Sequence, residues 1–283
     1  MPLMPHWPLY LGANKDLGSS AERIYPILAE FGNPQNKLQN VIHVTGTNGK
    51  GSTTSYIASI LQNSGYKVGK YTSPHIHLCN ERVQINGEMI SDDNMYEILE
   101  NMRFCCEKLG INPTIFEATT ILAIVYFAKN KCDFNVIEVG MGGLLDATNI
   151  FDENPPLASV ITPIHLDHTK FLGNMIYEIA WQKSFIIKPG GLCICAPQPL
   201  EAKQIINQRC ADINADIYHF DEDFSCARIE EDAENWYFEM NSNKYSRVIQ
   251  EEIFLPYSKL ICPDYQLQNA SVAVATILVI NAR

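Results

Sequence analysis

The stretch that decides the fold is VIHVTGTNGKGSTT, residues 41 to 54. It begins with an apolar segment, Val41 to Val44, which predicts a short buried strand. Three glycines then surround Lys50, and Ser52 opens a segment with apolar residues at helical spacing. A glycine-rich turn, the positive end of a helix and a lysine together favour phosphate binding. The sequence therefore predicts a phosphate-binding loop between a strand and a helix.

This loop differs from the standard P-loop, GxxxxGK[ST], at two positions. Val44 takes the place of the first glycine, and Gly51 separates Lys50 from Ser52. The alternative interpretation is a glycine-rich turn that carries a surface lysine. We favour a nucleotide site because glycines, a lysine and hydroxyl groups coincide at a helix start, where a hydroxyl can also bind Mg²⁺.

The composition is that of an ordinary globular protein with an acidic balance. The chain has 283 residues, of which 46% are hydrophobic and 19% charged, and its formal net charge is −11. This length can bury a sizeable core in one large domain or two smaller ones. The acidic balance and the lack of a Lys/Arg run argue against a nucleic-acid partner. The N-terminal residues predict no signal peptide, and no apolar run predicts a membrane span.

Nine cysteines are scattered along the chain without a CxxC pair. The odd number and this spacing predict reduced, buried thiols in a cytoplasmic protein. Cys193 and Cys195 would share one face of a strand, but two ligands do not make a zinc site.

Strand and helix segments alternate after the glycine-rich loop. We expect strands at 66–73 and 134–139, a strand that runs into a polar turn within 158–173, helices at 91–109, 114–129, 175–191 and 264–283, and a hairpin at 83–90 around Asn86-Gly87. The alternation predicts an α/β fold, with a mostly parallel sheet and helices on both faces. Residues 221–260 predict a small antiparallel, β-rich appendage. The polar motifs follow predicted strands, so one crevice is expected to hold them.

Several polar residues stand out against their apolar surroundings. Glu138 lies in an apolar strand, and a buried carboxylate needs a partner charge or a metal. His165, Asp167 and His168 follow the next strand, as a hydrogen-bonded turn or as a metal or phosphate site. Lys183 lies in the apolar stripe of the helix expected at 175–191, where snorkelling of its ammonium group to solvent could explain it.

These motifs resemble the folate branch of the Mur ligase superfamily, the folylpolyglutamate synthase/dihydrofolate synthase family. The similarity rests on TGTNGKGS at 45–52, TIFEATT at 114–120, EVGMGGLLDATN at 138–149, LDHTKFLG at 166–173 and QLQNA at 266–270. The resemblance implies that residues 1–283 form the ATP-binding central domain of a Mur ligase, with 1–39 as a segment on the substrate side. The family's C-terminal ligase domain would then be absent.

The resemblance also implies an activity and its cofactors. The family joins L-glutamate to dihydropteroate or to a folate polyglutamate tail through an acyl phosphate, with ATP and two Mg²⁺ ions. Catalytic roles would fall to Lys50, His168 and a carbamylated Lys183. The Mg²⁺ ligands would be Ser73, Glu138, His168 and Lys183.

The remaining implied site residues divide into two sets. Nucleotide contacts would come from Thr47, Asn48, Gly49, Lys50, Gly51, Ser52 and Asn269. Substrate contacts would come from Asp16, Leu17, Thr114, Ile115, Phe116, Glu117, Leu145, Asp146 and Ala147. From the residues alone, Ser73-Pro74 is a turn and Glu117 complements a helix dipole.

The chain departs from the family pattern at Leu144, often arginine there, at Ser184-Phe185, often Ala-Gly, and at Tyr265, usually His or Phe. Its final helix is still apolar at Arg283, so a further domain is expected to follow in the family. A second hypothesis is therefore a nucleotide-binding domain that is inactive alone or acts with a separately encoded C-terminal partner. A third is a ligase acting on a cell-wall precursor, and the FEATT, DATN and LDHTKFLG segments favour the folate substrate instead.

Overall fold

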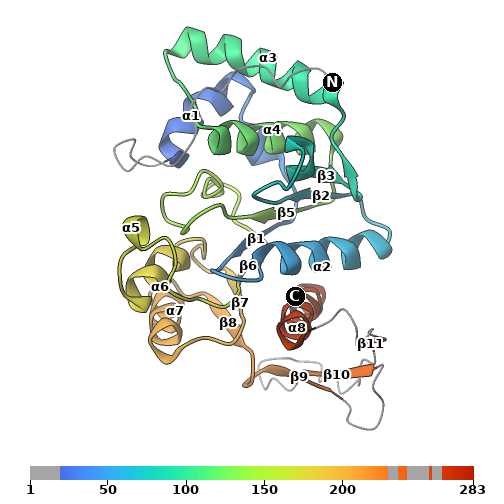
Figure 1. The fold of residues 1–283 in the computed structure, drawn as a ribbon, viewed down its shortest axis with the longest axis vertical. Coiled ribbons are helices and arrows are strands. Elements are labelled where there is room, and N and C mark those ends of the chain that lie inside the picture. The colour runs from blue at the N-terminus through green and yellow to red at the C-terminus, as the bar shows by residue number, and fades with distance from the viewer. Residues whose placement is uncertain (1–19, 229–234, 241–254, 257–262) are drawn as a thin grey trace.

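An eight-stranded sheet forms the centre of the computed structural model, which describes residues 20–228, 235–240, 255–256 and 263–283 (Figure 1). The strand order is β4-β3-β2-β5-β1-β6-β7-β8. Strands β2, β5, β1, β6, β7 and β8 are parallel, and β3 and β4 are antiparallel. The bounds are β1 Val41–Thr45, β2 Val68–Tyr71, β3 Val83–Ile85, β4 Glu88–Met89, β5 Phe134–Glu138, β6 Ala158–Ile161, β7 Leu192–Cys195 and β8 Asp216–His219.

Helices cover both faces of this sheet. They are α1 Ser20–Glu30, α2 Lys50–Asn63, α3 Asp92–Leu109, α4 Ile115–Asn130, α5 Thr169–Leu172, α6 Ile176–Ser184, α7 Leu200–Asp212 and α8 Asp264–Ala282, with 3₁₀ turns η2 Pro34–Lys37 and η3 Cys79–Arg82. Helices α2 and α8 pack on one face, against side chains such as Ile42 and Val44 of β1. On the other face, α1, α3 and α4 cover β2 and β5, while α6 and α7 cover β6 and β7. The predicted α/β fold is confirmed.

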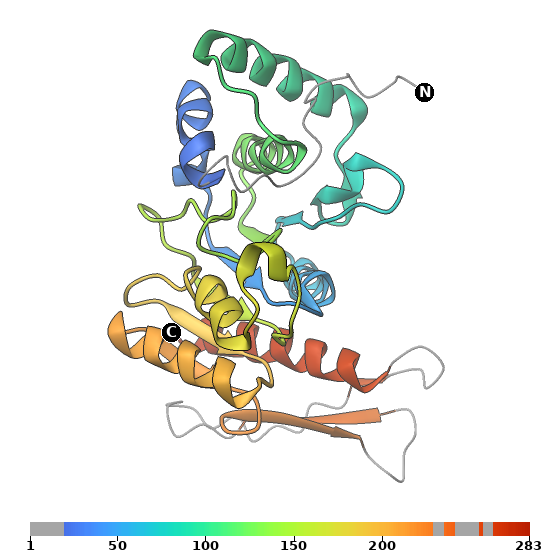
Figure 2. The ribbon, with the colours of Figure 1, turned by 60° about the vertical axis from the view of Figure 1, so that its left-hand side comes forward.

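A second, three-stranded antiparallel sheet lies below the first. Its strands are β9 Phe224–Arg228, β10 Asn235–Met240 and β11 Leu255–Pro256, in the order β11-β10-β9. Figure 2 shows α8 running between this small sheet and the main body. Helix α8 therefore joins the two sheets and also packs against α2, the helix that follows the glycine-rich loop.

Local sequence signals account for many of the element ends. Ser91 caps α3 by accepting a hydrogen bond from the Asn94 N–H, and Gly110 ends the helix at φ 66°. The hairpin turn places Asn86 and Gly87 at φ 49° and 79°, as a two-residue turn with positive φ at both positions requires.

The helix expected at 175–191 is shorter than predicted. Helix α6 ends at Ser184, and the chain continues through tight turns to Pro189. Proline has no N–H to donate to the Phe185 carbonyl and disfavours helical backbone at Lys188. Ile187 still packs in the core beside α6, but it does so from the turn and not from the helix. None of the helices in the described ranges is long and apolar enough to cross a membrane.

Candidate nucleotide and metal site

The glycine-rich loop makes two close approaches that only glycine allows. Gly46 has φ 148°, and a Cβ there would lie 1.9 Å from Thr162 Oγ1. Gly49 has φ 83°, and a Cβ there would lie 2.3 Å from Asn269 Oδ1 on α8. The loop therefore lies directly against the end of β6 on one side and against α8 on the other.

The start of α2 is open to a ligand. Gly49 is its N-cap residue and supplies no side-chain hydrogen bond to the first turn. The first N–H groups of a helix have no intrahelical partner and carry partial positive charge. Gly49, Lys50, Gly51 and Ser52 are all at or next to this turn, so the structure brings these predicted nucleotide residues together. This arrangement suits a phosphate group.

The loop is also tied to the segment after β6. The Thr47 N–H donates to the Pro163 carbonyl at 2.9 Å. The Thr47 hydroxyl donates to the His165 carbonyl at 3.1 Å and accepts from the His165 N–H at 3.0 Å. The ends of the parallel strands β1 and β6 thus hold the loop in one conformation.

Two lysine ammonium groups converge on a single backbone oxygen. Lys183 Nζ donates to the Gly46 carbonyl oxygen at 2.7 Å, and Lys50 Nζ donates to the same oxygen at 3.2 Å. Within the described part of the chain, neither lysine forms an ion pair with a carboxylate. Burial and, to a lesser extent, the Lys50 ammonium lower the pKa of Lys183 to about 7, although the charges of Asp146 and Asp167 act in the opposite direction.

Glu138 provides a buried carboxylate beside this pair. It ends β5, is 3% exposed, and accepts a hydrogen bond from the Ser73 N–H at 3.0 Å. A Cβ on Gly51 would lie 3.5 Å from its Oε2 atom, so Glu138 faces the start of α2. Burial raises the pKa of Glu138 to about 7, and the charges of Lys50 and Arg82 oppose this effect. A buried carboxylate without an ion pair among the described residues is a suitable oxygen ligand for Mg²⁺.

Predicted substrate residues from α4 lie above the glycine loop that follows β5. Thr114 caps α4, and Glu117 completes a capping box with it. Glu117 is 1% exposed and pairs with Arg23 at 3.0 Å, so its carboxylate has structural partners. The Phe116 ring covers Gly140, where a Cβ would lie 2.3 Å from Cζ. Ile115 is half-buried at the first turn of α4.

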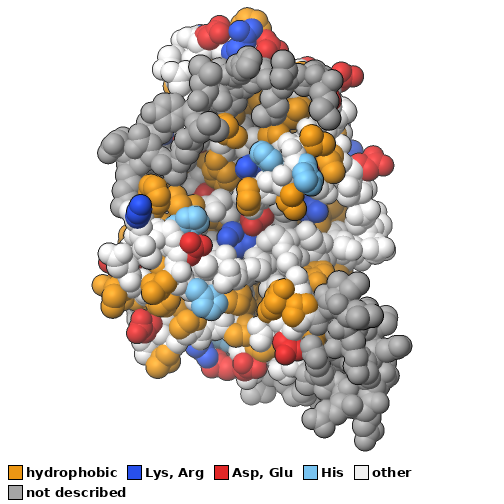
Figure 3. All heavy atoms as spheres, in the orientation of Figure 1, with side chains coloured by type: hydrophobic (Ala, Val, Ile, Leu, Met, Phe, Trp, Pro, Cys, Tyr) orange, Lys and Arg blue, Asp and Glu red, His pale blue; other side chains and the backbone are white. Residues whose placement is uncertain are grey.

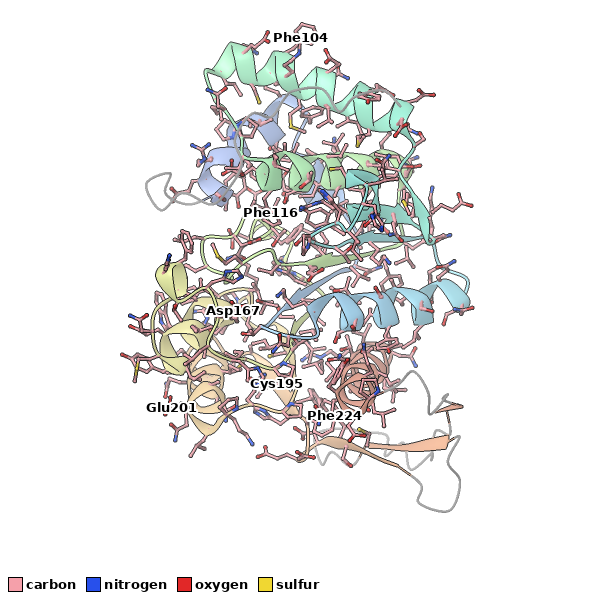
Figure 4. The ribbon with its side chains drawn as sticks, in the orientation of Figure 1. Phe104, Phe116, Asp167, Cys195, Glu201 and Phe224 are labelled. Atoms are coloured by element: carbon pink, nitrogen blue, oxygen red, sulfur yellow. The ribbon has the colours of Figure 1, made fainter. Side chains whose placement is uncertain are left out.

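The other predicted substrate residues occupy different environments. Leu145 is about half exposed, Asp146 is buried, and Ala147 is fully buried. Asp16 and Leu17 lie outside the described residues. Figure 4 labels Phe116 on α4 and Asp167 before α5, on opposite sides of the middle of the molecule.

His168 stands apart from the other predicted metal ligands. It is the N-cap residue of α5 at φ 48°, its side chain is half exposed, and Asp167 lies 3.6 Å away. Across the described ranges, no group of three or more His, Cys, Asp or Glu residues has the arrangement of a metal site. Ser73, Glu138 and Lys183 are close to the glycine-rich loop, whereas the described side-chain partner of His168 is Asp167 and not one of these three residues.

A cavity of about 720 Å³ opens beside the loop. Its wall includes Asn48, Ser52, His165, Gln198, Tyr265 and Asn269. Figure 3 shows basic, acidic and histidine side chains gathered around the middle of the same side of the molecule as in Figure 1. The cavity adjoins the open helix start, so a molecule with an aromatic part and phosphates could lie across both.

Two buried residues that the sequence analysis did not select join this site. His43, in the middle of β1, lies 2.8 Å through Nε2 from the Thr148 hydroxyl. Thr148 in turn donates to Asp146 Oδ1 at 2.6 Å. The signals were a histidine in an apolar strand and a threonine two residues after an acid, and neither pattern alone indicates a pairing.

The fold and this geometry define an α/β phosphate-binding protein, with a nucleotide-sized cavity at the carboxyl ends of parallel strands. Residues 44–277 match the sequence model of the Mur ligase middle domain, so the chain belongs to the Mur ligase middle-domain family. The family membership that the sequence motifs predicted is confirmed.

Similar proteins extend this result. The chain is 42% identical over 206 residues to a dihydrofolate synthase/folylpolyglutamate synthase of Bacillus subtilis, covering 71% of this chain and 46% of that protein. It is 36% identical over 261 residues to the folylpolyglutamate synthase of Lacticaseibacillus casei, covering 90% of this chain and 58% of that protein. A solved folylpolyglutamate synthase complex with AMPPCP and folate has 34% identity, a TM-score of 0.84, and coverage of 97% of this chain and 65% of its own. The chain thus spans about half the length of the curated relatives it matches.

Proposed function

We propose that this chain is the nucleotide- and substrate-binding part of a carbon–nitrogen ligase that joins L-glutamate to dihydropteroate or to a folate polyglutamate tail. The observation that carries the proposal is the convergence of Lys50 and Lys183 on the Gly46 carbonyl, beside an uncapped helix start and the buried carboxylate of Glu138. The similarity to folylpolyglutamate and dihydrofolate synthases supports the choice of substrate.

The phosphates of ATP would bind at the loop formed by Thr47, Asn48, Gly49, Lys50, Gly51 and Ser52. The N–H groups of the first turn of α2 and the Lys50 ammonium offset the phosphate charge. Asn269 packs on Gly49 and lines the cavity next to the loop, which fits contact with the nucleoside part.

Two anions must approach each other for the reaction to proceed. The terminal phosphoryl group of ATP passes to a substrate carboxylate, which gives an acyl phosphate and ADP. The amine of glutamate then attacks the acyl carbon, loses a proton, and displaces phosphate to form the amide. Residues that neutralise and orient the two anions therefore supply most of the rate enhancement.

Glu138, Ser73, His168 and Lys183 would hold two Mg²⁺ ions. Bound Mg²⁺ would neutralise phosphate charge and orient the phosphoryl group. Lys183 fits carbamylation because its lowered pKa, about 7, leaves much of the amine neutral. The neutral amine attacks CO₂ and loses a proton, which gives an anionic carbamate in place of the ammonium.

The substrate would lie across α4 and the loop after β5. Thr114, Ile115, Phe116 and Glu117 are at or before the first turn of α4, and the Phe116 ring covers Gly140. Leu145, Asp146 and Ala147 follow in the loop, and residues 1–39, with Asp16 and Leu17, would complete this side. We place the protein in the cytoplasm, since its eight described cysteines are all free thiols.

The chain spans about half the length of its relatives, so a second candidate is a nucleotide-binding domain that is inactive alone. In that case a C-terminal ligase domain, in the same protein or separately encoded, would complete the site for glutamate.

Calorimetric titration tests the proposal, using Mg²⁺ and a non-hydrolysable ATP analogue with and without dihydropteroate or folate. We expect binding of the nucleotide and of one pterin substrate. Lys50→Ala should lose nucleotide binding, and unchanged affinity in that variant would remove the loop from the proposal. A folded chain that binds neither ligand would contradict the proposal.

Lys183→Ala tests the proposed carbamate, in the ligase assay with any second domain present. We expect activity to fall below detection and to recover in part with added short carboxylates, which replace the carbamate oxygens. Full activity in Lys183→Ala would exclude Lys183 from the mechanism.

A further inference from the structure

Two side chains of the central strand form hydrogen bonds to the loop after β5. On the face of β1 turned toward that loop, two polar side chains take positions that apolar residues usually fill. Thr45 donates from Oγ1 to the Gly142 carbonyl at 2.7 Å, and His43 bonds to Thr148 at 2.8 Å. Both β1 residues are fully buried, at 0% exposure.

His43, Thr148 and Asp146 form a chain of hydrogen bonds, and the Asp146 carboxylate, as an acceptor, sets their directions. Asp146 Oδ1 accepts from the Thr148 N–H at 2.9 Å and from its hydroxyl at 2.6 Å. Because the Thr148 hydrogen points to the carboxylate, the Thr148 oxygen must accept from His43 Nε2. His43 therefore carries its proton on Nε2, and its Nδ1 has no partner among the described residues.

The surroundings keep His43 neutral and in place. Phe151 contacts the imidazole edge-on, with ring centroids 5.8 Å apart. Burial lowers the pKa of His43 to about 3, and the charge of Lys188 acts in the same direction. An apolar residue would fill this position without leaving a nitrogen unpaired, so the single hydrogen bond to Thr148 is the feature that requires a histidine.

The far end of the chain of hydrogen bonds is Asp146, a buried member of the proposed substrate residues. Among the described residues, Asp146 Oδ2 accepts a hydrogen bond only from the Met141 N–H, at 2.9 Å, so this oxygen can accept a second one from a ligand. No described basic residue forms an ion pair with Asp146. Gly143, in the same loop, packs so closely on α6 that a Cβ would lie 2.9 Å from the Lys183 carbonyl oxygen.

We propose that His43 and Thr148 are positioning residues that orient the Asp146 carboxylate toward the pterin substrate. This inference rests on the proposed function, because Asp146 is a substrate residue only there. It adds that the specificity of this side of the site is set from β1, the strand that also leads into the nucleotide loop. Neither His43 nor Thr148 contacts the substrate in this proposal.

The test compares substitutions that remove each hydrogen bond with substitutions that keep it. Thr148→Val and His43→Leu remove the bonding groups, whereas Thr148→Ser keeps the hydroxyl and His43→Gln keeps an N–H donor near the position of Nε2. Ser159→Ala is the matched control, since Ser159 is a buried hydroxyl on the same face of the sheet that bonds to the Ile186 carbonyl instead. Thermal unfolding confirms that each full-length variant is folded.

Folate and nucleotide affinities are measured by calorimetry for all variants. We expect Thr148→Val and His43→Leu to bind folate or dihydropteroate about tenfold or more weakly, with unchanged affinity for the ATP analogue. Thr148→Ser, His43→Gln and Ser159→Ala should bind both ligands as the wild type does. Wild-type folate affinity in Thr148→Val, or equal losses in Thr148→Val and Thr148→Ser, would overturn the inference.

Hydrogen exchange separates this inference from the proposed function. If the wild type binds nucleotide but no pterin, the proposed substrate is wrong, and exchange at the Met141 and Thr148 amides then tests the positioning. Faster exchange in Thr148→Val and His43→Leu, but not in Thr148→Ser and His43→Gln, supports it. Unchanged exchange in all four variants would overturn it.

Discussion

Gly49 shows how one residue can serve the fold and the site together. Its left-handed backbone begins α2, and its missing side chain leaves room for Asn269. Any Cβ at this position would both strain the backbone and push Asn269 away from the cavity. The position therefore couples the nucleotide loop to α8 through contact alone.

Gly49→Ala and Gly65→Ala separate these two effects. Gly65 has φ 92° and nothing within 4 Å of an added Cβ, so Gly65→Ala should cost only the backbone strain, about 1 kcal/mol. Gly49→Ala should cost more and should weaken nucleotide binding. Urea unfolding and nucleotide titration measure the two quantities, and equal costs with equal affinities would contradict the close contact.

His43 predicts a pH dependence of stability with a definite sign. Its pKa is about 3 in the folded protein and about 6.5 when unfolded, so between these values the unfolded chain binds more protons. The free energy of unfolding should therefore fall as the pH falls from 6.5, by up to about 1.4 kcal/mol per pH unit from this residue. At higher pH the contribution is fully present.

His43→Gln isolates that contribution, because other groups titrate in the same range. Between pH 7 and pH 4.5, the wild type should therefore lose more unfolding free energy than His43→Gln does. Chemical denaturation at several pH values measures it. A constant difference would mean that His43 is protonated in the folded state.

The sequence predicts single residues better than it predicts their partners. Lys50, Glu138 and Lys183 stand out because each is a charge in an apolar or glycine-rich context. The link between His43 and Thr148 could not be predicted, since the two residues are 105 positions apart and meet only after the sheet forms. The ion pair between Arg23 and the Glu117 carboxylate could not be predicted either, for the same reason.

Helix α4 illustrates an element whose capping residues are also proposed to bind substrate. Thr114 accepts from the Glu117 N–H at 3.1 Å, and Glu117 accepts from the Thr114 N–H at 2.7 Å. Such reciprocal bonds hold the first turn of the helix and hence the Phe116 ring over Gly140.

Thr114→Ala should destabilise the protein by about 1 kcal/mol, the usual cost of losing an N-cap side chain. Ser91→Ala is the matched control, because Ser91 caps α3 in the same way. Both variants should lose similar stability, and only Thr114→Ala should weaken folate or dihydropteroate binding. Equal substrate affinities in the two variants would assign Thr114 a purely structural role.

Element boundaries followed from capping signals where these were present. Ser91, Gly110 and the Asn86-Gly87 turn correctly predict the ends of α3 and the hairpin. The predicted helix at 175–191 was wrong beyond Ser184, because apolar periodicity continues through Ile187 although the chain has already left the helix. Periodicity reports burial, and a turn can bury an isoleucine as well as a helix can.

At the scale of the whole molecule, the main sheet contributes side chains to all three apolar clusters. The cluster under α1, α3 and α4 and the cluster under α6 and α7 lie on one face, and the cluster under α2 and α8 lies on the other. Among the described residues, each cluster includes side chains of the main sheet, so unfolding of the helices on either face would expose apolar surface on the shared strands.

Thermal unfolding should therefore be a single transition. Its midpoint temperature should rise when Mg²⁺ and an ATP analogue are both present. A ligand at 100 times its dissociation constant adds about 2.7 kcal/mol to the free energy of unfolding. Circular dichroism and the fluorescence of the tryptophans, among them the half-exposed Trp181 on α6, should report the same midpoint. The unfolding midpoint of Lys50→Ala should not change when nucleotide is added. Two separate transitions in the wild type would contradict the conclusion that the three clusters share one sheet.

The central position of β1 has a consequence for how such a protein can change over generations. One five-residue strand ends in the nucleotide loop and carries, two residues earlier, the histidine bonded toward Asp146. A substitution that shifts this strand by a fraction of an ångström would disturb the nucleotide loop and the proposed substrate side at once. Adaptation to a new substrate is therefore expected to accumulate in α4 and in the loop after β5, where variation leaves the nucleotide loop intact.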